Sequence, residues 1–127
     1  MDQTFLVNIE FQKSAEVVAA LDRAKVKVDV ALFAHLDEYG DWRLVLAARA
    51  FDRLEMRKAF RLVRDAMDAA GMTGYHNLPI LIYRMDHPFI RELRKKSAKW
   101  KYVEGDRIAL QSFADKFVDD SYVYRIR

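Results

Sequence analysis

The residues best suited to a chemical role are cations in the C-terminal third of the chain. Five of them recur at helical spacing or directly after it: Arg91, Arg94, Lys95, Lys99 and Lys101. On a helix the first four form one positive stripe, because residues three and four apart share a face. Such a ridge attracts phosphates and releases counterions on binding. The spacing therefore predicts a nucleic-acid-binding helix over about residues 90–101.

The opposite side of the same helix carries residues that can dock on the protein body: Ile90, Leu93, Ser97 and Trp100. Trp100 either anchors the helix or stacks on a base, because with Lys101 and Tyr102 it places aromatic surface beside charge. Residues 84–101 hold seven Lys/Arg against two Asp/Glu, within a chain of net charge +3. This concentration favours an anionic partner. The alternative interpretation is a solvated face that keeps the protein soluble.

A second group with chemical potential is His35, Asp37, Glu38 and Asp41. A metal-dependent nuclease using His35, Asp37 and Asp41 is one alternative function, since histidine and carboxylates bind divalent metals. Their spacing matches no zinc signature, and acidic residues are common in turns. The chain lacks a G-x-S-x-G motif and a glycine-rich phosphate loop. We therefore expect a non-catalytic protein without metal or other cofactor.

These residues must be positioned by a set of strands and helices, which hydrophobic periodicity predicts. The expected strands are 4–11, 26–36, 42–51, 78–83, 107–113 and 121–126, and the expected helices are 15–24, 53–70 and one beginning at Asp86 or His87. The first alternates Phe5, Val7, Ile9 and Phe11 with other residues. A turn at 37–41 containing Gly40 joins two strands into a hairpin.

This order, β-α-β-β-α-β, predicts an α+β fold of the ferredoxin-like split βαβ type. It would have an antiparallel sheet with helices on one face, followed by the basic helix and extra strands. Residues 1–127 would form a single domain, with a core at about 4–85 and an extension at about 86–127. Asp52 and Glu55 are spaced as a capping box for the second helix.

Aromatic residues concentrate toward the end of the chain: Tyr83, Phe113, Phe117, Tyr122 and Tyr124. They would form a stacking platform, complete the core or line a dimer interface. A sheet covered on one face leaves a broad apolar surface, so we expect a homodimer. A related alternative is a protein–protein module in which the open sheet face binds a second polypeptide.

Two segments, DEYGDWRLVLAARAFD and DDSYVYRIR, resemble parts of short, uncharacterised bacterial α+β proteins that share this hairpin and the YVYRI ending. The resemblance implies a prokaryotic origin and carries no catalytic residues. Some of that group are linked to defence or toxin–antitoxin neighbourhoods. The resemblance thus adds a regulatory or antitoxin-like subunit to the protein-partner alternative.

The composition of the chain bears on the cellular compartment in which the protein functions. The sequence has no cysteine, which excludes disulfides and thiolate metal sites and is compatible with a reducing cytoplasm. No apolar run approaches the roughly 20 residues of a membrane-spanning helix. The amino terminus lacks the basic start and apolar stretch of a secretory signal. A cytoplasmic protein without a membrane partner is the expectation.

Overall fold

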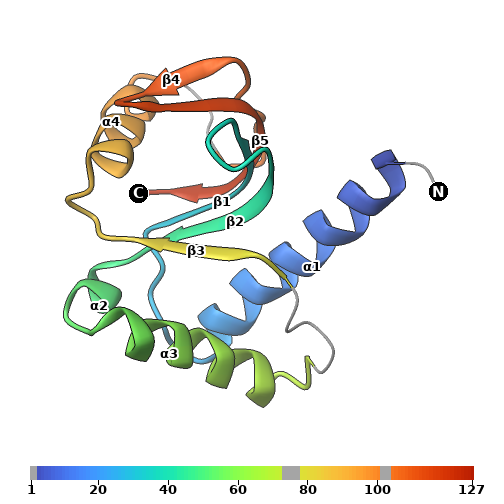
Figure 1. Cartoon of the computed structure of the whole chain (residues 1–127). Coiled ribbons are helices and arrows are strands. Elements are labelled where there is room, and N and C mark those ends of the chain that lie inside the picture. The colour runs from blue at the N-terminus through green and yellow to red at the C-terminus, as the bar shows by residue number, and fades with distance from the viewer. Residues whose placement is uncertain (1–2, 73–77, 101–103) are drawn as a thin grey trace.

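The computed structural model describes residues 3–72, 78–100 and 104–127 as an α+β fold (Figure 1). Its helices are α1 (Gln3–Arg23), α2 (Arg49–Asp52), α3 (Met56–Ala69) and α4 (Pro88–Ser97). Its strands are β1 (Val30–Leu36), β2 (Asp41–Ala47), β3 (Ile80–Tyr83), β4 (Gln111–Phe113) and β5 (Lys116–Ile126). None of the helices in the described ranges combines the length and apolarity needed to cross a membrane.

The predicted hairpin is confirmed. β1 and β2 pair antiparallel, with Val30 opposite Ala47 and Leu36 opposite Asp41. Gly40 in the connecting turn has a φ of +68°, a left-handed conformation that glycine adopts at little steric cost. β1 is buried along nearly its whole length, which explains its almost wholly apolar sequence.

The predicted strand at 4–11 is wrong, because this segment lies within helix α1. Eight alternating residues also fit a helix when the pattern beyond them has a period of three to four. Phe11, Ser14, Val18 and Leu21 continue such a pattern, and the last three are buried. No glycine or proline interrupts residues 3–23, so Ser14 lies inside the helix and does not cap it.

The ferredoxin-like strand order is consequently not observed. The sheet has the order β3-β2-β1-β5-β4, with β3 parallel to β2 and the remaining neighbours antiparallel. In the absence of a first strand, β3 lies directly beside β2. The predicted strand at 121–126 is part of β5, which pairs with β1 inside the sheet. Of the predicted strand at 107–113, only residues 111–113 form β4, and an isolated bridge joins Arg107 to Tyr122.

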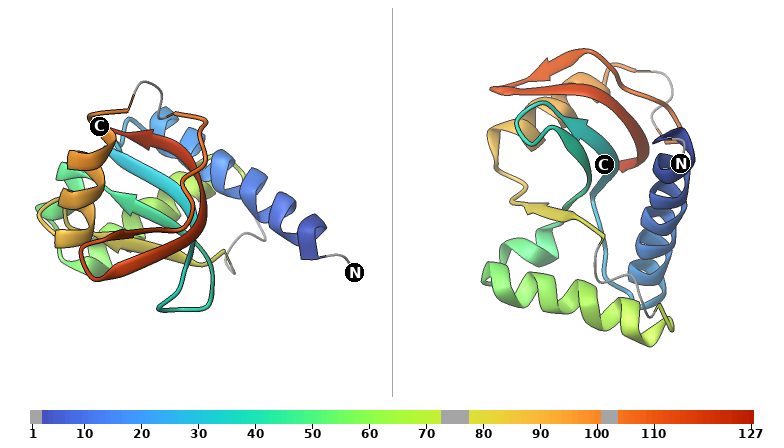
Figure 2. Two further views of the ribbon diagram at one scale, coloured as in Figure 1. Left: turned by 90° about the horizontal axis from the view of Figure 1, so that it is seen from above. Right: turned by 45° about the vertical axis from the view of Figure 1, so that its right-hand side comes forward.

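Helices cover both faces of this sheet, whereas the sequence predicted cover on one (Figures 1 and 2). α1 and α3 pack on one face, where Val17, Leu21 and Val63 contact β1 and β2. α4 packs on the other face, where Phe89, Ile90 and Leu93 form a second core with Leu32 and strands β4 and β5. The apolar sheet face that the predicted homodimer would use is therefore covered by the protein's own helices. The basic helix is followed by β4 and β5, and the last element of the chain is a strand.

Candidate nucleic-acid interface

Helix α4 begins close to the predicted position. His87 is its N-cap, and the imidazole Nδ1 of His87 accepts a hydrogen bond of 3.1 Å from the Phe89 main-chain N–H. Pro88 follows in the first helical turn, where its missing N–H has no helical partner to lose. A histidine thus performs the capping role that Ser, Thr, Asp or Asn usually fill.

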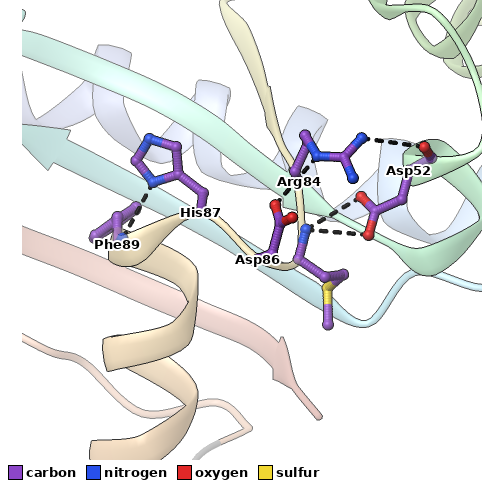
Figure 3. Close-up of polar contacts among 6 residues, drawn as sticks. Asp52, Arg84, Asp86, His87 and Phe89 are labelled. Atoms are coloured by element: carbon purple, nitrogen blue, oxygen red, sulfur yellow. Dashed lines mark hydrogen bonds and ion pairs between the residues drawn. The ribbon is translucent and has the colours of Figure 1, made fainter.

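A carboxylate from another element fixes the segment that leads into α4 (Figure 3). The two Asp52 carboxylate oxygens lie 3.1 and 3.3 Å from the main-chain nitrogen of Met85, which donates. Arg84 Nη1 also donates to the Asp52 carbonyl oxygen at 3.2 Å, and its Nε lies 3.1 Å from Asp86. The predicted capping box is therefore wrong. Glu55 is the N-cap of α3 without a side-chain cap bond, and Asp52 is engaged elsewhere.

The inward face of α4 agrees with the prediction. Ile90 and Leu93 are fully buried, Ser97 is 6% exposed, and Phe89 joins them as a fully buried residue. Trp100 is half-buried and packs against the same core. Its position supports the anchoring role of the two that the sequence left open.

The outward face of α4 and the turn after it carry the predicted cations. Arg91, Lys95 and Lys99 are exposed and Arg94 is half-buried. Among the ion pairs of the described residues, the only one within α4 joins Lys96 to Glu92 at 3.8 Å. Within the described residues, none of Arg91, Arg94, Lys95 and Lys99 forms an ion pair with an Asp or Glu side chain. Lys101 lies outside the described residues.

A hollow of about 450 Å³ lies between α4 and the end of β5. Four cations line it, namely Arg91, Arg94, Lys95 and Arg127. Arg94 Nε donates a 2.7 Å hydrogen bond to the main-chain oxygen of Arg127, which joins helix and strand at this point. The Arg127 guanidinium lies 3.8 Å from the Glu104 carboxylate, so it is the partly neutralised member of the group.

Arg91 and Lys95 also line a second hollow of about 400 Å³, together with Pro88, Glu92 and Ala114. These two side chains therefore belong to both depressions and are central to the positive surface. Sequence reasoning missed Arg127, because 33 residues separate it from Arg94. Its only sequence signal was the basic R-I-R ending.

The aromatic residues of the C-terminal part do not form one platform. Phe113 is fully buried and Tyr83 is half-buried, both in the core beneath α4. Burial raises the pKa of the Tyr83 hydroxyl above its usual range. Tyr122 and Tyr124 lie on the opposite face of the sheet, with ring centroids 4.6 and 5.4 Å from that of Phe11.

The predicted His35–Asp37–Asp41 group does not assemble. His35 Nδ1 lies 2.9 Å from an Asp119 carboxylate oxygen, and Asp41 binds Arg43 at 2.9 Å. Across residues 3–72, 78–100 and 104–127, no three His, Asp or Glu side chains are placed to hold a metal ion. The sequence could not show the His35–Asp119 pair, which depends on β5 lying beside β1.

The basic surface beside α4 is thus the candidate site that the geometry brings together. Comparisons of the chain with protein-family models, with curated proteins and with solved structures gave no match.

Proposed function

We propose that this protein is a non-catalytic nucleic-acid-binding module, and that the outward face of α4 contacts the phosphates. The observation that carries the proposal is the hollow in which Arg91, Arg94 and Lys95 meet Arg127. The first three are cations without acidic partners among the described ion pairs, on a helix whose other face is fully buried. The helix holds their main chain in place, so no backbone ordering is needed on binding.

The spacing of the exposed cations suits a phosphate backbone. Arg91 and Lys95 are one helical turn apart, about 6 Å along the axis. One strand of duplex DNA places a charge about every 3.4 Å, so neighbouring phosphates lie within reach of both side chains. Arg91 can also form bidentate bonds to a phosphate. Nothing in these contacts reads a base, and we therefore expect binding with little sequence preference.

Salt dependence tests the proposal. We would measure the anisotropy of labelled duplex DNA, single-stranded DNA and single-stranded RNA at several salt concentrations. The triple variant Arg91→Ala/Lys95→Ala/Lys99→Ala should make the slope of log affinity against log salt less steep on duplex DNA. Each lost contact accounts for about 0.9 of slope, so the expected decrease is about 2 to 3.

A matched variant distinguishes the effect of the α4 cations from the effect of the total charge of the protein. Arg23→Ala/Lys27→Ala/Lys58→Ala removes three exposed cations that lie away from α4. It should keep the native slope. An equal decrease in both triple variants, or no salt-dependent binding of any of the three nucleic acids by the native chain, would refute the proposal.

The alternative function, a regulatory or protein-binding subunit, does not use the α4 surface. Its structural support is the edge of the sheet at β3.

A further inference from the structure

β3 is an edge strand with a free side. Among the strands of the described residues, β3 ends the sheet and pairs with β2 alone (Figure 1). The Pro79 carbonyl oxygen accepts a 2.8 Å hydrogen bond from the Leu44 N–H and so points toward β2. Main-chain groups alternate in direction along a strand, so those of Ile80 and Ile82 point away from β2. Within the described residues, no hydrogen bond of another element occupies them.

A groove of about 490 Å³ runs between this edge and helix α3. Its apolar lining comes from both elements: Phe60, Val63, Met67, Leu78 and Ile80. Phe60 is 39% exposed and Met56, one turn earlier on α3, is 48% exposed, whereas Val63 and Met67 of the same helix are buried. The groove is therefore an open apolar surface adjoining free backbone groups.

The rim of the groove is positively charged. Arg57, Arg61 and Arg64 line it from α3, at spacings of four and three residues, and Asp68 is the single acid among the described lining residues. Arg57 and Arg61 are exposed and form no ion pair with another described residue. An occupant of this groove thus meets apolar side chains at its floor and guanidinium groups at its side.

We propose that this groove binds an extended, acidic segment of a partner protein, which adds to the sheet as a strand beside β3. Main-chain bonds to Ile80 and Ile82 would supply affinity, as in other cases of strand addition. Side chains alternate along a strand, so every second residue would point toward α3. Among these residues, apolar side chains would enter the groove and acidic side chains would meet Arg57 and Arg61.

The same features disfavour a second copy of this chain. Pairing of two β3 strands about a two-fold axis gives an isologous interface, in which each residue set meets its own copy. Both α3 helices would then lie on one side of the extended sheet, and their arginine rims would face each other. Like charges placed in this way cost binding energy.

The test uses the whole chain and four labelled peptides. The probe, called the Glu-Val peptide, consists of two Val-Thr-Glu-Thr repeats, so that every Val and Glu lies on the same side of the strand. The comparison peptides replace Glu by Lys, replace Val by Glu, or carry N-methyl groups on alternate amides. The Glu-Val peptide should bind, and each comparison peptide should bind at least about tenfold more weakly. N-methylation removes N–H donors that the carbonyl groups of β3 would accept from.

Charge reversal locates the binding. Arg57→Glu/Arg61→Glu should weaken binding of the Glu-Val peptide by at least about tenfold, since both contacts become repulsive. The control Arg53→Glu/Lys58→Glu changes the charge equally, outside the groove lining, and should bind as the native chain does. Urea unfolding of both variants checks that each is folded, which is expected because all four side chains are exposed.

Three results would overturn the proposal. They are equal weakening in the control variant, unchanged binding of the N-methylated peptide, and dimerisation of the native chain on a sizing column that Arg57→Glu/Arg61→Glu abolishes. The first would indicate general charge attraction, the second would remove strand addition, and the third would assign the groove to a second copy. None of these measurements involves nucleic acid or α4.

Discussion

The Tyr124 hydroxyl donates a 2.6 Å hydrogen bond to the main-chain carbonyl oxygen of Phe11. This bond joins β5 near the end of the chain to α1 near its start, across 113 residues. The two aromatic rings are also stacked, with centroids 5.4 Å apart. The contact therefore fixes the part of α1 that approaches β5, while the helix continues beyond the sheet toward its N-terminal end (Figure 2).

Tyr124→Phe tests the strength of this link. The substitution keeps the stacked ring and removes the hydroxyl, so we expect a loss of about 1 kcal/mol in the free energy of unfolding. Urea unfolding followed by circular dichroism measures it. Tyr122→Phe is the matched control, because the Tyr122 hydroxyl makes no hydrogen bond within the described residues; it should change stability by less than about 0.5 kcal/mol. Equal losses in both variants would contradict a specific role for the Phe11 bond.

Phe11 is the last residue of the segment 4–11, which the sequence pattern predicted wrongly to be a strand. Alternation over eight residues fits a strand, and the helical pattern becomes clear only when Val17, Val18 and Leu21 are read as its continuation. The strand assignment then imposed a ferredoxin-like order on the sheet. Local periodicity does not specify which strands pair, so the position of β5 beside β1 was not accessible from the sequence.

The hairpin and the face of α4 were predictable because short-range patterns determine them. Gly40 marks the turn, and Ile90 and Leu93 mark the buried side of the helix. Partners distant in sequence were not predictable. Arg94 meets Arg127, and His35 meets Asp119 across 84 residues, only because the sheet places β5 between β1 and β4.

Acid stability should depend on the pair formed by Asp22 and Arg125. Arg125 Nη1 and Nη2 lie 2.9 and 2.8 Å from the two Asp22 carboxylate oxygens. The hydrogen bond from Arg125 lowers the pKa of Asp22. Below the ordinary aspartate value of about 3.9, the unfolded chain binds more protons at this site than the folded chain. The stabilising effect is therefore present above that pH and is lost as the pH falls through the folded pKa.

Asp22→Asn should remove this part of the pH dependence. We expect the variant to be less stable than the native protein at pH 6, by about 1 kcal/mol or less because the Asp22 side chain is 45% exposed. The difference should shrink toward zero as the pH approaches 3. Urea unfolding across pH 3–7 measures both chains. A difference that is constant over this range would show that the Asp22 carboxylate does not titrate differently in the folded state.

Asp52 should matter for stability although it is only half-buried. Asp52→Ala removes both oxygens that accept from the Met85 N–H. Met85 is only 7% exposed, so this N–H is buried. An unsatisfied buried donor costs about 1–3 kcal/mol, and we expect a loss of unfolding free energy in that range. Asp86→Ala breaks only the exposed pair with Arg84 and should cost less than about 0.5 kcal/mol. Similar losses in the two variants would show that the Met85 contact is not the cause.

The two faces of α4 should have separable roles. Leu93 is fully buried between α4 and the sheet, so Leu93→Ala should lower the free energy of unfolding by about 2–5 kcal/mol. Arg91 is exposed on the other face, so Arg91→Ala should change it by less than about 0.5 kcal/mol. Urea unfolding and nucleic-acid anisotropy, measured on both variants, compare the two effects. Under conditions where Leu93→Ala remains folded, it should keep the native salt slope, whereas Arg91→Ala should lower the slope by about 0.9 on duplex DNA. A loss of stability in Arg91→Ala would instead mean that the cation supports the fold, and its exposure on α4 would then no longer favour a phosphate contact.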